Sequence, residues 1–520
     1  MKKGPFITLD NISVRLWDQL YLQNISWQIN EDEHWAILGP NGAGKSTLVR
    51  AIFHDVPVVR GKITHHFVER DDASFAERLK TIGYVSSELH REIIERENLQ
   101  ETFRDFSGKV DEITTVKDIL LNGGFDERDQ KTNRMMDAVA RRTGIEDVLG
   151  RSITTISMGE MRKALIARAL MKSPKLLILD EPFDGLDDGS RHALAGIINE
   201  LMADSMRVIL ITHRFDEILP NITNVLFLKD GRLHTCGVKE EVFNQGVIQD
   251  VYGVQDGMMR PSFHQANEDG PRCDIKIPPK TGTEKKKAGQ ILIEMKNVTV
   301  RYGDVVALEE FNWRVMSDEN WVVLGPNGAG KSTALKLITG DNLQAYSNEV
   351  YLFGKKKGSG ESIWEIKRDL GFVSSELQVQ YPGNFTAFEI VCSGFFDSVG
   401  LFRYCSTEQR ELSRDWIKTL GIDYLADQGF GKLSFGQRQL VLIARAMVKS
   451  PILLMLDEPC EGLDIANRAK VLEVADYIGS KTDTNLIFVT HREEEILPCS
   501  THKLELSHGR VKNMDALSRN

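Results

Sequence analysis

The chain has 520 residues, of which 41% are hydrophobic and 27% charged, so it is long enough for two or more globular domains. Its formal net charge of −10 argues against a broad nucleic-acid-binding surface but permits a local basic patch. No apolar run approaches the roughly 18–20 residues that span a bilayer, and the N-terminus lacks a signal-peptide-like stretch. The six cysteines show no CxxC pairing and are typical of a cytoplasmic protein, so any role at the inner face of the plasma membrane needs a separate partner.

The first strong motif is the string GPNGAGKST at residues 39–47, which follows a predicted strand at 35–38 and precedes a predicted helix. In this pattern the glycines let backbone N–H groups face a nucleotide's phosphates, and the helix adds the positive end of its dipole. We expect Lys45 to reach the β- and γ-phosphates and Ser46 to ligate Mg²⁺. The predicted ATP-binding residues here are Gly39, Asn41, Gly42, Gly44, Lys45, Ser46 and Thr47.

A mainly helical pattern between Ser87 and Ser157 predicts an inserted helical lobe. The string Ser157-Met-Gly-Glu then opens a predicted helix at 162–171. A serine hydroxyl, a glycine N–H and a helix dipole together form an anion-binding end, although Ser-x-Gly alone usually marks only an N-cap. We predict that Ser157 and Gly159 contact ATP.

Two continuous apolar runs follow, at 175–179 and 207–211, and both are of the kind found in a buried parallel sheet. Asp180 ends the first run, where a carboxylate can hold Mg²⁺, and Glu181 can polarise the attacking water. His213 ends the second, where an imidazole can hold the γ-phosphate and the water. The alternation of strands and helices predicts an α/β fold.

A Pro- and Gly-containing stretch at 253–289, with a lysine run at 285–287, is typical of a linker. The lysine run is either a solvated tether or a nucleic-acid contact. We therefore predict a first domain at 1–252, a linker at 253–289 and a second domain at 290–520.

The whole motif set recurs after the linker, with predicted strands at 321–324 and 485–489. Two complete sets predict two sites that bind and hydrolyse ATP with Mg²⁺. The second set consists of the loop residues Gly325, Asn327, Gly328, Gly330, Lys331, Ser332 and Thr333, then Ser434 and Gly436 before a predicted helix at 438–448, Asp457 for the metal, and the catalytic candidates Glu458 and His491.

These motifs, together with Gly-Leu-Asp at 185–187 and 462–464, resemble in kind and order those of ATP-binding cassette (ABC) ATPases. The resemblance covers nearly the whole chain apart from the linker. It implies tandem P-loop NTPase domains, each with a mostly parallel sheet core, an antiparallel β region and an inserted helical lobe.

The same resemblance implies how ATP is shared between the two halves. In that family two cassettes meet head to tail, so Lys45 would work with Ser434 and Gly436, and Lys331 with Ser157 and Gly159. Pairing within one chain and pairing between chains both remain open.

The resemblance also implies an aromatic residue that stacks on the adenine near the N-terminus of each cassette. Tyr302 matches in the second half, whereas Leu16, beside Trp17, stands at that place in the first.

Two departures from the family pattern concern the signature and the coupling glutamine. Met158 and Phe435 replace the first glycine of the signature but leave the serine and the second glycine. Ser87 and Ser375 stand where the family has the Q-loop glutamine that contacts Mg²⁺ and relays nucleotide state to a partner. The candidates to replace this glutamine are Glu88, Glu376 and Gln378.

The second half, through its segments at 338–350 and 358–377, further resembles the ModF-type twin-cassette ATPases, which are linked by name to molybdate transport. One hypothesis is therefore the ATPase component of an importer, docked on separate transmembrane subunits. The alternative is an ABC ATPase that acts on a ribosome, nucleic acid or regulatory partner. The linker lacks the long charged hairpin of translation-factor cassettes, but the missing glutamine argues against tight coupling to a membrane partner, so both hypotheses stay open.

Overall fold

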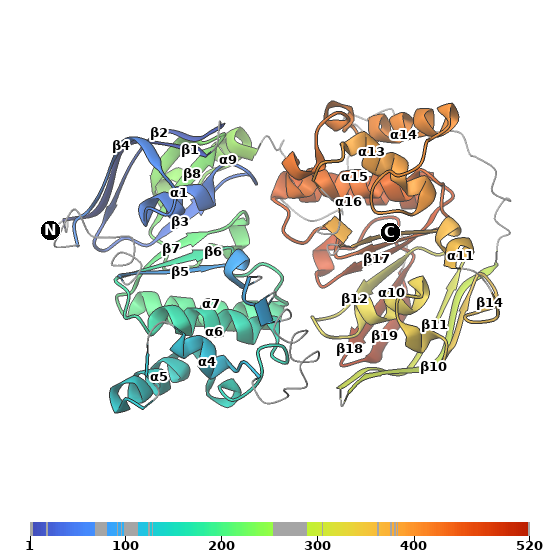
Figure 1. Ribbon diagram of the computed structural model, residues 1–520, viewed down its shortest axis with the longest axis horizontal. Coiled ribbons are helices and arrows are strands. Elements are labelled where there is room, and N and C mark those ends of the chain that lie inside the picture. The colour runs from blue at the N-terminus through green and yellow to red at the C-terminus, as the bar shows by residue number, and fades with distance from the viewer. Residues whose placement is uncertain are drawn as a thin grey trace. The chain divides into compact units, whose positions relative to one another are not determined.

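A computed structural model of the protein describes residues 4–16, 19–67, 81–90, 92–94, 96–97, 113–122, 125–126, 128–252, 289–303, 305–360, 363–374, 377–378, 381 and 383–517. Two compact units divide the chain, at Met1–Gln255 and Asp256–Asn520. Each unit combines a six-stranded sheet, an antiparallel sheet and a helical lobe (Figure 1). The predicted fold class is therefore confirmed.

In the first unit the six-stranded sheet has the order β5-β6-β7-β3-β8-β9, with parallel neighbours up to β8 and an antiparallel β9. Its strands are β3 (Trp35–Leu38), β5 (Ile82–Ser86), β6 (Leu176–Asp180), β7 (Arg207–Ile211), β8 (Asn224–Lys229) and β9 (Arg232–Val238). The antiparallel sheet, of order β2-β1-β4, consists of β1 (Pro5–Leu16), β2 (Gln19–Asn30) and β4 (Val58–His65).

The helices of the first unit lie on both sides of the six-stranded sheet. The antiparallel sheet and α1 share one hydrophobic cluster with β3, β6 and β7, while α6 and α7 lie on the other side (Figure 1). These helices are α1 (Lys45–Ile52), α4 (Val116–Leu121), α5 (Gln130–Thr143), η1 (Glu146–Val148), α6 (Met158–Leu170), α7 (Asp188–Ala203), η2 (Phe215–Glu217), α8 (Lys239–Val242) and α9 (Gln245–Tyr252).

The second unit repeats this topology, with the sheet orders β15-β16-β17-β12-β18-β19 and β11-β10-β13-β14. The strands are β10 (Ile291–Tyr302), β11 (Val305–Met316), β12 (Trp321–Leu324), β13 (Glu349–Leu352), β14 (Lys355–Lys356), β15 (Leu370–Ser374), β16 (Leu453–Asp457), β17 (Asn485–Thr490), β18 (His502–Ser507) and β19 (Arg510–Ala516). The helices are α10 (Lys331–Thr339), η4 (Leu343–Ala345), α11 (Ile363–Asp369), α13 (Ala387–Ser393), η5 (Gly394–Phe396), α14 (Thr407–Thr419), η6 (Asp423–Leu425), η7 (Phe430–Lys432), α15 (Phe435–Met447), α16 (Ile465–Lys481) and η8 (Glu493–Glu495).

The strand order brings the predicted site residues to one edge of each large sheet. In the first unit β6, β7 and β3 are parallel neighbours, so the segments after Asp180, Ile211 and Leu38 leave the sheet at the same edge. Apart from the half-buried Arg207 at the start of β7, these strands are buried on both faces, which explains their continuous apolar sequences. In the second unit β16, β17 and β12 have the same arrangement.

The predicted bounds of three elements were wrong by a few residues. The helices expected at 162–171 and 438–448 begin earlier, at Met158 and Phe435, because Ser157 and Ser434 are N-caps that accept the N–H of the third helical residue. The strand expected at 175–179 runs to Asp180, because this residue still pairs with Ile211 of β7.

No helix in the described part of the chain is both long and apolar enough to cross a membrane. The described cysteines, at 236, 392, 405, 460 and 499, are free thiols. Cys273 and the linker prediction fall outside the described residues, except for Gly289.

The helical lobe of the second unit depends on a close approach at Gly394. A Cβ atom there would lie 2.1 Å from the carbonyl oxygen of Arg445 in α15. We expect Gly394→Ala to push α13 from α15 and to destabilise the lobe by about 1–3 kcal/mol. Hydrogen exchange of the α13 and α15 amides measures this loss.

The matched control is Gly196→Ala on the exposed side of α7, where an added Cβ meets nothing within 4 Å. That change should stabilise α7 by up to about 1 kcal/mol, because alanine favours a helix more than glycine does. Unchanged amide protection in Gly394→Ala would contradict the packing argument.

Candidate functional site

Each phosphate-binding loop curls between a buried strand and a helix. Gly44 and Gly330 stand directly before α1 and α10 with left-handed φ values of 98° and 99°. A side chain at either position would collide with the preceding antiparallel sheet, since a Cβ at Gly330 would lie 2.5 Å from the carbonyl oxygen of Ala307. The loop thus requires glycine where the backbone turns its N–H groups inward.

The loop lysines lie buried inside these curls. The ammonium of Lys45 donates to the carbonyl oxygens of Gly39 at 2.8 Å and Pro40 at 3.2 Å. Lys331 makes the same contacts with Gly325 and Pro326, at 2.8 and 3.0 Å. Both ammonium groups therefore lie at the helix N-terminus where the phosphates of a nucleotide would bind.

A buried carboxylate faces the serine of the first loop. Asp180 is 5% exposed, and its Oδ2 accepts the hydroxyl of Tyr84 at 3.0 Å. Burial raises the pKa of Asp180 to about 6, although hydrogen bonds from Ser46 and Tyr84 oppose the shift. Among the described residues no group donates to Oδ1 of Asp180, so this oxygen is a ready ligand for a cation. Asp457 ends β16 in the same way and is 8% exposed.

The next residue in each unit has strained backbone geometry. Glu181 and Glu458 have left-handed φ values of 51° and 47°, and their N–H groups donate to Ile211 and Val489 of the neighbouring strands. Non-glycine residues adopt this conformation infrequently, and strained positions of this kind cluster at active sites.

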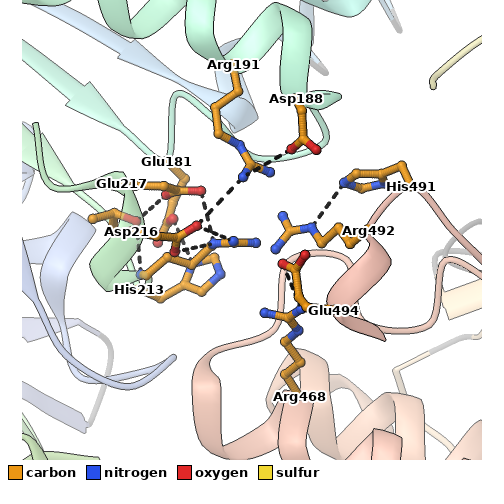
Figure 2. Close-up of polar contacts among 12 residues, drawn as sticks. Glu181, Asp188, Arg191, His213, Asp216, Glu217, Arg468, His491, Arg492 and Glu494 are labelled. Carbon is orange, nitrogen blue, oxygen red and sulfur yellow. Dashed lines mark hydrogen bonds and ion pairs between the residues drawn. The ribbon is translucent and has the colours of Figure 1, made fainter. Parts of the chain in front are cut away.

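This turn directs Glu181 at the switch histidine that follows β7. Nδ1 of His213 lies 2.7 Å from Oε2 of Glu181, as Figure 2 shows. Burial alone would lower the pKa of His213, but the charge and hydrogen bond of Glu181 raise it to about 9. Burial likewise opposes ionisation of Glu181, yet the charge of His213 and the charge of Lys45 lower the pKa of Glu181. The pair is therefore an imidazolium with a carboxylate at neutral pH.

The second unit brings the same residue types together with different distances. Nδ1 of His491 lies 3.3 Å from Oε2 of Glu458, and the ammonium of Lys331 lies 3.1 Å from Oε1. Burial opposes ionisation of Glu458, but its hydrogen bond with His491 and the charge of Lys331 lower its pKa to about 2. This carboxylate is fully ionised at neutral pH.

The signature serines begin α6 and α15 as capping boxes. The hydroxyl oxygens of Ser157 and Ser434 accept N–H groups of Glu160 and Gln437, and the Ser157 side chain also hydrogen-bonds with the Glu160 carboxylate. The second signature glycine has a packing role, because a Cβ at Gly436 would lie 2.4 Å from the Asn467 side chain. Packing of α15 on α16 thus explains why this glycine is present while Phe435 occupies the position before it.

The predicted adenine-stacking tyrosine is exposed at the end of β10. Tyr302 is 51% exposed, and its phenol oxygen accepts the Asn342 side-chain amide at 2.9 Å. This hydrogen bond holds the phenol while the ring remains accessible. Leu16 is half-buried at the end of β1, and Trp17 lies outside the described residues.

The positions that replace the coupling glutamine are only partly described. Ser87 directly follows β5 and is half-buried, and Glu88 is exposed; Ser375 and Glu376 lie outside the described residues. The side chain of Gln378 is buried and donates to Gln439 of α15, so it is engaged within the helical lobe, and its role as a replacement for the glutamine stays a prediction.

Two residues near the candidate sites were missed by the sequence analysis. Tyr84 orients Asp180 in the first unit, whereas its counterpart Phe372 in the second unit has no hydroxyl. The sequence held one sign of this role: Tyr84 and Phe372 differ at matching positions of two otherwise similar segments. Asn342, which holds Tyr302, has no motif that marks it.

Comparison with known proteins agrees with this geometry. The family model described as "ABC transporter" matches the chain twice, at residues 22–184 and 308–461. The chain is 38% identical over 494 residues to the ABC transporter ATP-binding protein ModF of Escherichia coli, with 94% of each chain covered.

Two further relatives have no assigned function. An uncharacterized ABC transporter ATP-binding protein of Schizosaccharomyces pombe is 26% identical, covering 94% of this chain and 95% of its own length. The Bacillus subtilis protein YlmA, also uncharacterized, is 37% identical over 42% of this chain and 84% of its own length. The two family matches and the two complete motif sets show that this chain belongs to the ABC transporter ATP-binding family and is an ABC ATPase with two cassettes.

Proposed function

We propose that the chain hydrolyses Mg²⁺-bound ATP at two composite sites and acts as the ATPase component of a membrane importer for a molybdate-type oxyanion. The observation that carries the transport role is the 38% identity with ModF over 94% of both chains. We retain cassette 1 at 1–252, a linker at 253–289 and cassette 2 at 290–520 as the proposed domains.

In the proposed mechanism the ionised Glu181 and Glu458 accept the proton of the attacking water. Their lowered pKa values keep both carboxylates charged at neutral pH. His213, held through Nδ1 by Glu181, directs its Nε2 N–H at the γ-phosphate. Lys45 exchanges its loop carbonyl contacts for phosphate oxygens, and the loop N–H groups hold the rest of the phosphate charge.

The chain's own residues fit a divalent cation beside this loop. Ser46 is hydrogen-bonded to Asp180, whose Oδ1 has no donor among the described residues. Ser332 and Asp457 would be their counterparts in cassette 2. Bound Mg²⁺ supplies charge compensation for the β- and γ-phosphates.

We further propose that the cassettes pair head to tail, so that Ser434 and Gly436 complete the site of Lys45, and Ser157 and Gly159 complete that of Lys331. The support is chemical: each serine caps a helix N-terminus, and the N–H groups and dipole of that end suit the γ-phosphate of a nucleotide held elsewhere. Tyr302 stacks on the adenine of cassette 2 in this proposal.

Removing both water-polarising carboxylates should stop hydrolysis but not binding. We expect Glu181→Gln combined with Glu458→Gln to lower kcat about 10²- to 10⁴-fold, because the proton of the attacking water then has no acceptor. ATP affinity, measured by fluorescence titration, should stay near wild type. Glu200→Gln, an exposed position on α7, is the control, and hydrolysis by the double variant at the wild-type rate would refute these roles.

The head-to-tail arrangement predicts a crossed pattern of nucleotide labelling. Aspartate is a good N-cap but repels phosphate, so Ser434→Asp should keep α15 capped while it weakens ATP binding about tenfold at the Lys45 site. A photoreactive ATP analogue should then label cassette 1 less and cassette 2 as before. Ser157→Asp is the matched variant and should show the reverse. Loss of labelling in the substituted cassette itself would contradict the arrangement.

Affinity capture tests the transport role. With ATP present, the Glu181→Gln and Glu458→Gln variant should remain in its closed state and retain its partners. Co-purification of integral membrane subunits is the expected result. Recovery of ribosomal proteins, nucleic acid or a regulatory protein, with no membrane subunit, would replace the importer role with the alternative.

A further inference from the structure

A cluster of four charged groups surrounds each switch histidine. An arginine directly follows the histidine, a second arginine lies on the helix after Gly-Leu-Asp, and the last two residues of the following 3₁₀ turn are acidic. In cassette 2 the first residue of this turn, Glu493, is acidic as well and pairs with Lys503. The inner acid of each turn is buried and accepts the hydroxyl of the threonine before the histidine. The members are Arg191, Arg214, Asp216 and Glu217 in cassette 1, and Arg468, Arg492, Glu494 and Glu495 in cassette 2.

In cassette 1 the turn acids hold the arginine that follows the histidine. Arg214 lies 2.5 and 3.1 Å from the Asp216 oxygens and 3.3 Å from Glu217. The helix arginine, Arg191, makes only longer ion pairs, at 3.6 Å to Asp188 and 3.7 Å to Asp216. In this part of the chain, no described residue forms a hydrogen bond with Nε2 of His213.

In cassette 2 the same acids pair with the helix arginine instead. Arg468 lies 3.2 Å from Glu494, and both are labelled in Figure 2. It lies 2.9 Å from Glu495. Arg492 has no ion pair with a described carboxylate, although it is only 9% exposed. Its Nε donates to Nε2 of His491 at 3.1 Å, which Figure 2 shows as a dashed line.

This contact determines what His491 can do. A guanidinium has only donors, so Nε2 of His491 must be the acceptor and carries no proton. The remaining ring proton is then on Nδ1, toward Glu458 at 3.3 Å. A histidine in this form has no N–H to offer a γ-phosphate oxygen from Nε2.

We propose that Arg492 is a built-in brake on the switch histidine of cassette 2, released when Glu494 and Glu495 leave Arg468 and capture Arg492. The released arrangement is the one that Asp216 and Glu217 make with Arg214 in cassette 1. This inference rests on the proposed role of the histidines in hydrolysis.

The exchange is physically accessible because it keeps every acid paired. Two carboxylates leave one arginine for another, so no buried acid loses its counter-charge. A buried guanidinium that contacts only a neutral imidazole is less favourably paired than one that contacts two carboxylates. A small bias, such as an incoming phosphate that favours a protonated Nε2, is therefore enough to shift the cluster.

Arg492→Met in the full-length chain removes the donor while it keeps an unbranched side chain. We expect kcat for ATP to rise roughly three- to tenfold, which is the rate factor that corresponds to the free energy of one hydrogen bond. KM should stay nearly unchanged, because the substitution leaves the phosphate loop intact. Arg214→Met is the matched control: Arg214 does not contact His213, so kcat should not rise. A fall in kcat or no change with Arg492→Met would overturn the brake.

A second variant tests the released arrangement even if Arg492→Met fails to fold. Arg468→Met frees Glu494 and Glu495 to capture Arg492, so it should raise kcat by a similar factor. The double variant Arg468→Met with Arg492→Met should gain no more than either single variant, because both remove one contact. Gains that multiply would overturn the proposal.

Histidine-selective ¹⁵N NMR reads the contact directly. The wild-type chain should show His491 with an unprotonated Nε2, and Arg492→Met should protonate it; an unchanged spectrum would overturn the brake.

His491→Ala tests the proposed catalytic role of the histidines separately from the brake. If it leaves kcat unchanged, the proposed role of the histidines fails and the brake with it. If it lowers kcat but Arg492→Met does not raise kcat, only the brake fails.

Discussion

The carboxylate–imidazole pair at the end of two neighbouring parallel strands is the contact on which the rest of each cassette depends. Glu181 reaches His213 only because its backbone turns left-handed directly after β6, while its N–H still pairs with β7. That turn costs conformational energy, and the surrounding buried sheet is what maintains it. The charges of Lys45 and of Asp180, the proposed metal ligand, both act on this ionised carboxylate.

The two cassettes have nearly the same motifs but different charge pairing around them. In cassette 1 the hydroxyl of Tyr84 donates to Asp180. In cassette 2 the counterpart is Phe372, which has no hydroxyl to donate. Both loop lysines donate to loop carbonyl oxygens, and Lys331 also pairs with Glu458. A buried charged group with several possible partners has alternative pairings of similar free energy. Small differences in packing therefore decide which pairing forms.

The family's Q-loop glutamine, which relays the nucleotide state to a partner, is missing from both cassettes. The structure describes two of the residues proposed around its position. Gln378 donates to Gln439 of the helical lobe, a contact that it would have to give up to take the place of the missing glutamine. Ser87 remains at the end of β5, next to the strand that carries Asp180. Short polar side chains at this place suit a water-mediated contact rather than a direct one.

The sequence by itself determined the fold class, the two-fold repetition and nearly every candidate site residue. These features follow from local patterns, such as the glycines of 39–44 and the apolar runs that end at Asp180 and Asp457. The start of α6 at Met158 was misplaced because an N-cap serine lies outside the helix that it begins. Only the tertiary structure decided that Gln378 points into the lobe and that Arg214 and Arg492 have different partners. The reason is physical: a motif specifies which groups meet at a sheet edge, but the choice among chemically equivalent partners depends on side-chain packing between distant segments.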